Sequence, residues 1–283
     1  MESTHIETAT RRHVSMDEMP SLPVTVIDAL RIANDTSASA DRLEQAICRD
    51  LSLAARVLKV ANSAFVGFRR QIDSVQEAIV LLGTRRIRAV ATMQALAPMF
   101  ESNQTDLISG RQLWAHGLAT ALWTQQIGQR IGYPKLAHVY TAGLMHDMGI
   151  VLLRGVLGEE YERVVDEVRR DEGELSLVET ERLGLNHCRV GAMVCAKWML
   201  SPRLTWLISH HHDDGLPDDV EAQILILADW CAQEMGVGEF PWSKRRNMPI
   251  DIVQALGLHP AEIPDLMNGS RFITEQIESL LGG

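Results

Sequence analysis

Signals that begin and end helices occur along almost the entire chain, and they limit the fold more than any other feature. Ser74 and Glu77 have the spacing of a capping box, and Gly83 stands where a glycine would end the helix that this box begins. Thr84 can then cap a second helix, whose apolar residues recur at helical spacing as far as Pro98. This segment therefore predicts two consecutive helices.

The same signals recur in both halves of the chain, whereas the signals of β-structure are almost absent. Ser201-Pro202 indicates a helix start, because proline is tolerated at the first helical position. Alternation of apolar and polar residues is nearly missing, and no Asn-Gly or Asp-Gly pair separates two strand-like runs. The sequence therefore predicts an all-α protein, a bundle of many helices. Further predicted caps are Asp41 with Glu44, Ser52, and Ser176 with Glu179.

Two polar stretches indicate how the chain is divided. Glu101–Gly110 separates two helical blocks, and Gly236–Pro249 is rich in glycine, proline and charge. We expect a flexible N-terminus at residues 1–16 and an N-terminal helical subdomain at 17–100. A second helical domain is expected at 101–235, followed by a C-terminal helical extension of two short outer helices at 236–283.

Charge and cysteine content argue against several classes of function. The first 100 residues carry 12 basic and 11 acidic side chains, whereas the remainder carry 15 and 26. An acidic surface repels phosphate backbones, so we expect no nucleic-acid partner, and short basic clusters such as Arg85-Arg86-Arg88 are expected on solvated faces. No apolar run is long enough to span a bilayer, and the first 19 residues lack the apolar stretch of a secretory signal. Four cysteines without CxxC spacing are typical of reduced thiols, so we expect a cytoplasmic protein that does not enter a membrane.

Histidines and carboxylates in the second half of the chain are the candidate functional residues. Asp229 follows the apolar run Ile224–Ala228 on a predicted helix, and an unpaired buried carboxylate costs on the order of several kcal/mol. Imidazoles and carboxylates that converge from separate helices are how helical bundles build metal sites. These residues are therefore either metal ligands or polar groups that hold a helix interface together. The candidates are His116, His146, Asp147, His187, His211, His212 and Asp229.

The order of these residues resembles that of the HD superfamily of metal-dependent phosphohydrolases. The chain is more closely similar to HDOD-domain proteins, which are bacterial signalling modules related to the HD-GYP phosphodiesterases. The resemblance covers roughly residues 17–215, most of the chain. The segments that carry it are Met19–Pro23, Arg49–Phe68, Ile72–Val90, Ala142–Leu153, Asn186–Leu200 and Ile208–His212.

The resemblance implies an N-terminal helical subdomain packed on an HD-like helical domain. It also implies a regulatory role without demonstrated catalysis, near two-component, chemotaxis or second-messenger signalling. The minimal metal set of the HD superfamily is complete, and three further imidazoles stand at HD-GYP-like positions. The minimal set is His116, His146, Asp147 and Asp229, and the further imidazoles are His187, His211 and His212.

The chain departs from active HD-GYP enzymes at two places. Ile150 stands where those enzymes have a lysine after the His-Asp-x-Gly motif, and Asp214–Pro217 is a remnant of the GYP signature. A cation near a reacting phosphate stabilises the charge of the transition state, so its loss disfavours catalysis.

Two functions remain open. The first is a regulatory HDOD-type protein that binds other signalling proteins and has no catalytic activity. The alternative is a metal-dependent phosphohydrolase acting on nucleotide or cyclic-dinucleotide phosphodiesters, in which Asp147 and the ion activate water. In either case the nitrogen and oxygen ligands suit a divalent transition metal such as Fe, Mn, Zn or Ni.

Overall fold

The regular elements of the chain are helices, as predicted. The computed structural model describes residues 22–62, 72–101, 109–171, 173–213, 215–237, 240, 247–268 and 271–281, and within these ranges it contains no β-strand. The elements are α1 (Val24–Asn34), α2 (Ala40–Cys48), α3 (Leu51–Ala61), α4 (Val75–Leu82), α5 (Thr84–Glu101), α6 (Gly110–Arg130), α7 (Leu136–Met145), α8 (Met148–Leu157), α9 (Glu159–Asp171), α10 (Leu175–Leu183), α11 (His187–Lys197), α12 (Pro202–Ser209), α13 (Val220–Glu234), α14 (Ile250–Ala255), the 3₁₀ helix η2 (Pro260–Glu262), α15 (Ile263–Asn268) and α16 (Arg271–Leu281).

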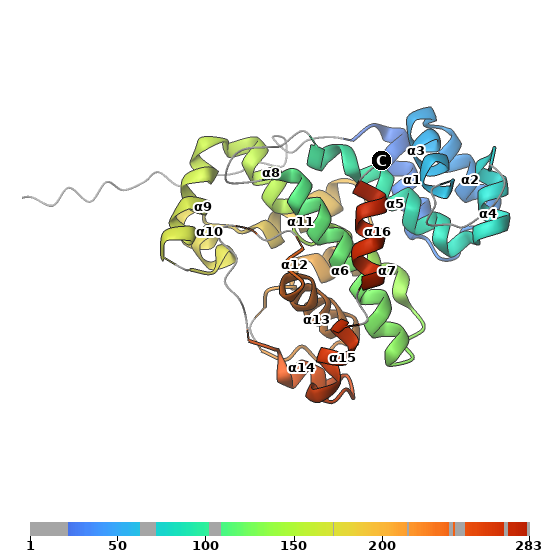
Figure 1. Ribbon diagram of the computed structural model, residues 1–283. Helices are drawn as coiled ribbons and strands as arrows, with labels where there is room; N and C mark the ends of the chain where they lie inside the picture. Colours follow the sequence, from blue (N-terminus) through green and yellow to red (C-terminus); the bar gives the residue numbers. More distant parts are fainter. Residues whose placement is uncertain are drawn as a thin grey trace, which may run out of the picture.

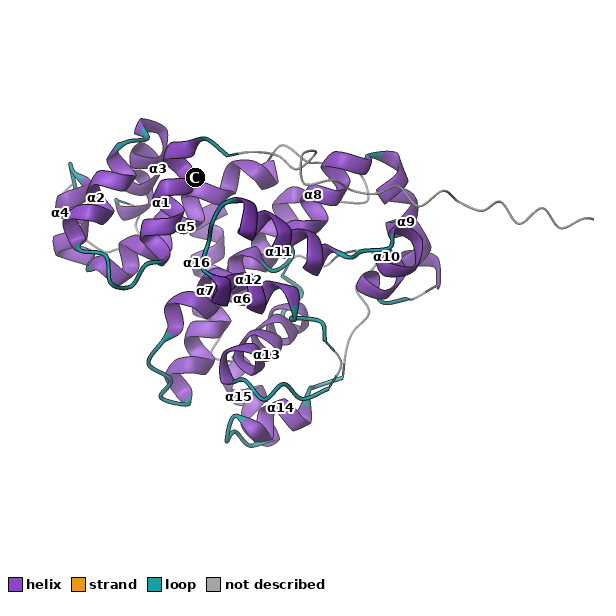
Figure 2. Ribbon diagram, turned by 180° about the vertical axis from the view of Figure 1, so that it is seen from behind, coloured by secondary structure: helices purple, strands orange, loops and turns teal. Residues whose placement is uncertain are grey.

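The helices are arranged around a central bundle (Figure 1). Helices α1–α5 lie together at one end, and the α9–α10 pair lies at the opposite end (Figures 1 and 2). Between them α6 packs against α7 and α13, and α11 packs against α8 and α12. Helix α16 packs along α6, whereas α14 and α15 lie beyond α13 (Figure 1). The described part of the C-terminal extension therefore contains more helices than the two expected from the sequence.

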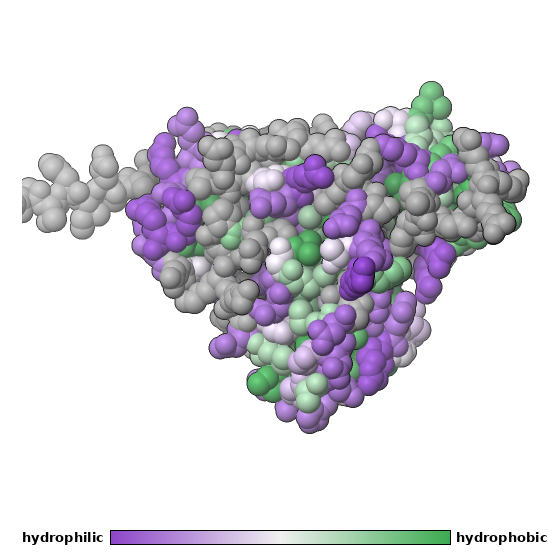
Figure 3. Space-filling view, in the orientation of Figure 1, coloured by the Kyte–Doolittle hydropathy of each residue, from purple (hydrophilic) through white to green (hydrophobic). Residues whose placement is uncertain are grey.

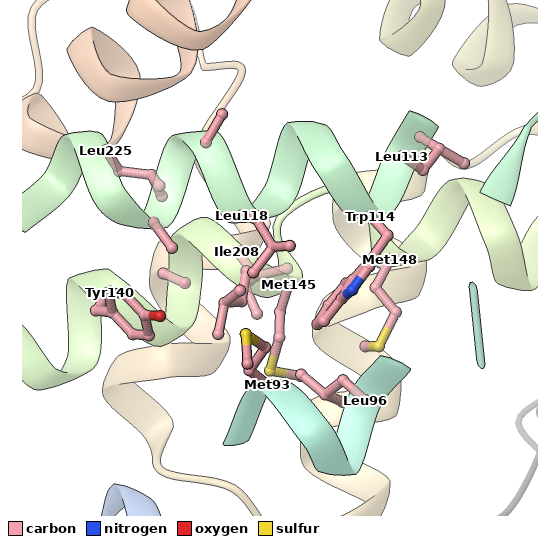
Figure 4. Close-up of a cluster of buried hydrophobic side chains, with 14 of the residues drawn as sticks. Met93, Leu96, Leu113, Trp114, Leu118, Tyr140, Met145, Met148, Ile208 and Leu225 are labelled. Carbon is pink, nitrogen blue, oxygen red and sulfur yellow. The ribbon is translucent and has the colours of Figure 1, made fainter. Parts of the chain in front are cut away.

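A buried hydrophobic cluster joins the N-terminal helices to the bundle (Figure 4). Met93 and Leu96 of α5 lie against Trp114 and Leu118 of α6 and against Met145 at the end of α7, and each of the five is at most 6% exposed. Full burial of a large apolar side chain contributes about 1.5–3 kcal/mol. The cluster thus fixes α5, and with it α1–α4, against the helices of the bundle.

Helices α4 and α5 begin where the sequence predicted, but α5 runs past its proline. The cap of α4 by Ser74 and its end at Gly83 are confirmed. The predicted end of α5 at Pro98 is wrong, because the helix continues for three residues. Proline cannot donate to the carbonyl of Gln94, one turn earlier. Nε of Arg56 donates to that oxygen instead, at 3.1 Å, so a long-range contact replaces the missing bond.

Two other predicted caps lie two residues from the observed ones. The cap of α2 is Ser39 rather than Asp41, and the cap of α3 is Asp50 rather than Ser52. Ser39 and Asp50 both have extended backbone, which lets the side chain accept a hydrogen bond from the first turn. Ser201 caps α12 as predicted.

Arg88 corrects the prediction that its basic cluster lies on a solvated face. Its side chain is 8% exposed, and its guanidinium donates hydrogen bonds to four backbone carbonyls in the range 32–38. These carbonyls belong to the last turn of α1 and the loop after it, where helix carbonyls lack partners within the helix. Arg85 and Arg86 are exposed, as predicted.

The predicted division into domains falls largely outside the described residues. Residues 1–16, positions 102–108 of the first polar break and most of positions 238–246 of the second are not described. The division therefore stays a prediction. Within the described part, Leu136–Leu157 is the one stretch long and apolar enough to cross a membrane, but 78% of its most apolar window is buried inside the fold. The apolar composition of Leu136–Leu157 is therefore explained by its burial in the core of the fold.

Gly149 allows α8 to approach α11 closely. A Cβ atom at this position would lie 1.9 Å from the backbone oxygen of His187, a separation at which the two helices could not stay in place. The contact brings the first residue of α11 beside the junction of α7 and α8. Gly155 lies on the same helix, and its Cβ position has no neighbouring atom within 4 Å.

We expect Gly149→Ala to lower the free energy of unfolding by about 1–3 kcal/mol, because the added methyl group forces α8 away from α11. The matched control, Gly155→Ala, should be neutral or stabilising by about 0.5–1 kcal/mol, because alanine favours the helix. Urea unfolding of both variants measures the difference. Wild-type stability of Gly149→Ala would contradict the close contact.

Candidate metal centre

The seven candidate ligands come from separate segments and meet in the middle of the bundle. Their convergence agrees with the expectation from the sequence. The contributing segments are α6 with His116, the α7–α8 junction with His146 and Asp147, the start of α11 with His187, the turn after α12 with His211 and His212, and α13 with Asp229.

Asp147 lies between two groups of imidazoles. Its Oδ2 atom is 3.3 Å from Nε2 of His146 and 3.7 Å from Nε2 of His116. Its Oδ1 atom is 3.5 Å from Nε2 of His187 and 3.6 Å from Nε2 of His211. Each oxygen of the Asp147 carboxylate therefore faces its own pair of imidazoles. Oδ2 faces His116 and His146, and Oδ1 faces His187 and His211.

Asp229 completes the first group. Its Oδ1 atom is 2.8 Å from Nε2 of His116 and 3.5 Å from Nε2 of His146. The side-chain amide of Gln233, one turn later on α13, donates to both carboxylate oxygens. The side chain of Asp229 is 4% exposed, so the burial predicted from its apolar helix is confirmed. These neighbours offset the desolvation of the charge.

Three of the imidazoles are held in place through their other nitrogen. Nδ1 of His146 and Nδ1 of His211 donate to backbone carbonyls three residues earlier, at 2.9 and 2.7 Å. Nδ1 of His187 lies 2.6 Å from Oε2 of Glu179. A proton fixed on Nδ1 leaves Nε2 as the atom that can coordinate, which is how metal-binding histidines are commonly oriented.

Glu179 is a site residue that the sequence reading missed. Its side chain is fully buried and accepts hydrogen bonds from the backbone N–H of His187, at 2.8 Å, and from the hydroxyl of Tyr161. It therefore fixes both the backbone and the imidazole of His187. Tyr161 lies on α9 and Glu179 on α10, so the outer helix pair reaches the centre through these two residues.

The capping box predicted for Ser176 and Glu179 is wrong. Helix α10 begins at Leu175, and Glu174 occupies its N-cap position. One signal of the true role was available in the sequence. Glu179 stands four residues after Leu175 and four before Leu183, and this spacing places it on the buried face of α10.

His212 and Cys188 lie at the edge of the second group. The ring of His212 is 4.2 Å from that of His211 and 5.1 Å from that of His187, between centroids. Sγ of Cys188 lies 4.0 Å from Nε2 of His211. Two sets of ligand atoms are therefore close enough to hold an ion. They are His116, His146 and Asp147, and His187, Cys188, His211 and His212.

The charges of the centre stabilise one another. Burial would raise the pKa of Asp147 and of Asp229, but the facing imidazoles hold both values well below the usual range. Burial opposes protonation of His146, but the two carboxylates outweigh it and raise its pKa to about 10. The pKa of His187 is raised in the same way, with Glu179 as the main favourable partner.

A divalent metal ion fits this arrangement. Nε2 of His146 and Nε2 of His187 are buried, and neither has a hydrogen-bond partner with good geometry among the described residues. Each unsatisfied nitrogen costs about 1–3 kcal/mol, which coordination to a metal would remove. Nitrogen and oxygen ligands of this kind suit a divalent transition metal, and Asp147 is placed to contact an ion in either group.

We expect Glu179→Gln to weaken metal binding about 10–100-fold, because the amide no longer supplies a charged acceptor for His187. Glu181, exposed on the same helix, gives the matched control Glu181→Gln, which should bind metal as the wild type does. Competition with a chromogenic chelator measures both affinities. Equal affinities for the two variants would contradict a positioning role, and thermal unfolding of both in chelator separates this role from a general loss of stability.

Comparisons with known proteins agree with the fold. The model of the HDOD domain family matches residues 19–214. An HDOD domain protein of unknown function from Geobacter sulfurreducens is 27% identical, with a TM-score of 0.68 over 94% of this chain and 84% of that one. A protein of Marinobacter aquaeolei VT8 provisionally named a signal transduction protein has a TM-score of 0.78 at 21% identity, over 96% of this chain and 61% of that one.

Other relatives are more distant in sequence. A protein of Shewanella amazonensis SB2B provisionally named a phosphohydrolase has a TM-score of 0.74 at 20% identity, over 94% of this chain and 96% of that one. An uncharacterized protein of Treponema pallidum (strain Nichols) is 21% identical over 215 residues, which are 75% of this chain and 41% of that protein. This chain thus spans less than half the length of that curated relative. Because the family model covers most of the sequence, the chain belongs to the HDOD domain family.

Proposed function

We propose that this protein is a metal-loaded signalling module that acts by binding other signalling proteins and not by turnover. The observation that carries the proposal is a complete ligand set that is almost closed to solvent. The side chain of Asp147 is 12% exposed, and those of His116, His146 and His187 are 1% exposed. A site of this kind suits an ion that holds helices together.

The residue after the His-Asp-x-Gly motif supports the same conclusion. Ile150 is 2% exposed and belongs to the hydrophobic core of α8, so this position supplies no cation to a phosphate. A missing positive charge at a phosphoryl site removes a contribution of a few kcal/mol, roughly, to transition-state stabilisation. Binding without turnover is the expected consequence.

The ion would act on the fold through the residues that hold it. When bound, it supplies positive charge to two buried carboxylates and links α6, α8, α11 and α13. We propose a cytoplasmic location, which is supported by the four free cysteines. The proposed ligands are His116, His146, Asp147 and Asp229 for one ion and Asp147, His187, His211 and His212 for a second.

A metal-dependent phosphohydrolase is the second candidate. The observation that favours it is the position of Asp147, whose two oxygens face separate imidazole pairs. Enzymes with two metals use such a carboxylate to hold the ions near one another, so that they stabilise the attacking and leaving oxygens of a phosphoryl group. The likeness to structures provisionally named phosphohydrolases supports the fold alone.

Metal removal should lower the melting temperature, and the effect should grow with pH. The pKa of His146 in the folded, metal-free protein is about 10, above its unfolded value of about 6.5. In the metal-free protein, the stabilisation that protonated His146 contributes is complete below about pH 6.5 and is lost as pH rises towards 10. A bound metal ion would replace this proton and keep the carboxylates paired at high pH.

Thermal unfolding of untagged protein at pH 7 and pH 9, with and without chelator, measures this difference. His138→Gln, outside the centre, should behave as the wild type, whereas His146→Gln should lose the response. A melting temperature unchanged by chelator at both pH values, with less than about 0.1 equivalent of bound transition metal, would contradict metal binding.

Turnover distinguishes the two functions. Metal-loaded protein should show no hydrolysis of nucleotide monoesters, nucleotide diesters or cyclic dinucleotides above the rate of His146→Ala, because no cation is placed beside the phosphate. Immobilised wild-type protein should capture signalling partners from a lysate of the native cell. Immobilised His146→Ala protein should capture less of them. Hydrolysis that His146→Ala abolishes would overturn the signalling proposal and support the enzyme.

A further inference from the structure

A groove separate from the metal centre lies where the N-terminal helices meet the bundle. It has a volume of about 480 Å3 and is formed by α3, α4, α5, α6, α7 and α16. A smaller hollow of about 50 Å3 shares Arg85, Gln125, Gln129 and Tyr140 with it, so the two form one concavity. Small-molecule sites are commonly of this size and lie between packed structural units.

The groove combines an apolar wall with an aromatic side chain. Met93, Leu122 and Ile273 line it from α5, α6 and α16. Phe272, the second residue of α16, is 50% exposed and also lines it. On the face shown in Figure 3, hydrophilic and hydrophobic residues of the described helices are mixed. An apolar wall beside an aromatic ring is suited to a flat ring of a ligand.

Two buried polar side chains in the groove lack a partner. Tyr140 is 8% exposed and Gln276 is 7% exposed, and both line the groove. Within the described part of the chain, neither has a hydrogen-bond partner. The polar atoms of both side chains are open to the groove and not sealed in the core, so each is available to hydrogen-bond a ligand there. Figure 4 shows Tyr140 at one end of the core cluster, on α7.

The charge of the groove is positive in an otherwise acidic protein. Arg85 and Arg86 line it and are exposed, and neither forms an ion pair with a described residue. The residues that line the groove include no Asp or Glu, although the chain has a net charge of −10. Arginine forks match the geometry of phosphate groups.

Amide side chains supply the remaining polar contacts. Gln125, Gln126 and Gln129 of α6 line the groove, and within the described residues none of them has a hydrogen-bond partner. An amide both donates and accepts, which matches the edge of a nucleobase.

We propose that this groove binds a nucleoside monophosphate, with its phosphate at Arg85 and Arg86 and its base against the apolar wall near the glutamines. The ligand would contact both the N-terminal helices and the bundle. It would also contact α7 six residues before His146, so it gives the signalling module an input distinct from the metal.

Calorimetric titration of the full chain with AMP and GMP tests the proposal, with adenosine, guanosine and inorganic phosphate as comparison ligands. At least one nucleotide should bind about tenfold or more tightly than its nucleoside and than inorganic phosphate, because each part of the ligand contributes. The double variant Arg85→Met/Arg86→Met should reduce that affinity to the level of the nucleoside, and Tyr140→Phe should reduce it about threefold to tenfold. Arg163→Met, an exposed cation on α9, is the control and should bind as the wild type does.

Two results would overturn the proposal. One is nucleotide binding no tighter than that of inorganic phosphate. The other is nucleotide binding that the double arginine variant leaves unchanged while chelation of metal abolishes it, which would place the nucleotide at the metal centre. Binding that survives chelation supports a separate site, and melting temperatures of all variants show that they are folded.

Discussion

The carboxylate of Asp147 is the group on which the arrangement of the central helices depends. Asp147 is the N-cap residue of α8, and its carboxylate lies within 4 Å of imidazoles from α6, α11 and the turn after α12. A buried charge without such neighbours costs on the order of several kcal/mol. The helices must therefore approach closely, and small residues permit it. A Cβ atom at Gly143 would lie 2.8 Å from the backbone of Ala121 on α6.

The outer α9–α10 pair has a structural purpose that follows from the same centre. It lies at the edge of the molecule (Figure 1). Tyr161 nevertheless bonds to Glu179, and Glu179 bonds to the first residue of α11. The imidazole of His187 is thus oriented by a carboxylate, which is in turn held by a phenol. Such outer partners fix the nitrogen that coordinates and raise its basicity. The pair therefore belongs to the site, although none of its residues is among the proposed ligands.

Much of the fold could be predicted because its signals are local. The cap at Ser201, the glycine end at Gly83 and the helical spacing of apolar residues are all encoded within a few positions. Two of the errors arose where a contact between distant residues altered a local rule. Arg56 satisfies the carbonyl that Pro98 leaves free, and Arg88 binds the end of α1 from within a cluster that resembles a solvated face.

The sequence by itself determined the helical class, the family and the seven histidines and carboxylates of the centre. The tertiary structure alone decided that both oxygens of Asp147 face imidazoles, that Glu179 orients His187, and that two unpartnered polar side chains line a basic groove. The physical reason is that these features join residues far apart in the chain. The spacing of Glu179 indicates that it lies on the buried face of its helix, but it does not reveal the contact with His187. The helical position of Tyr140 likewise does not reveal that it lines a groove, because local periodicity records no contact between distant residues.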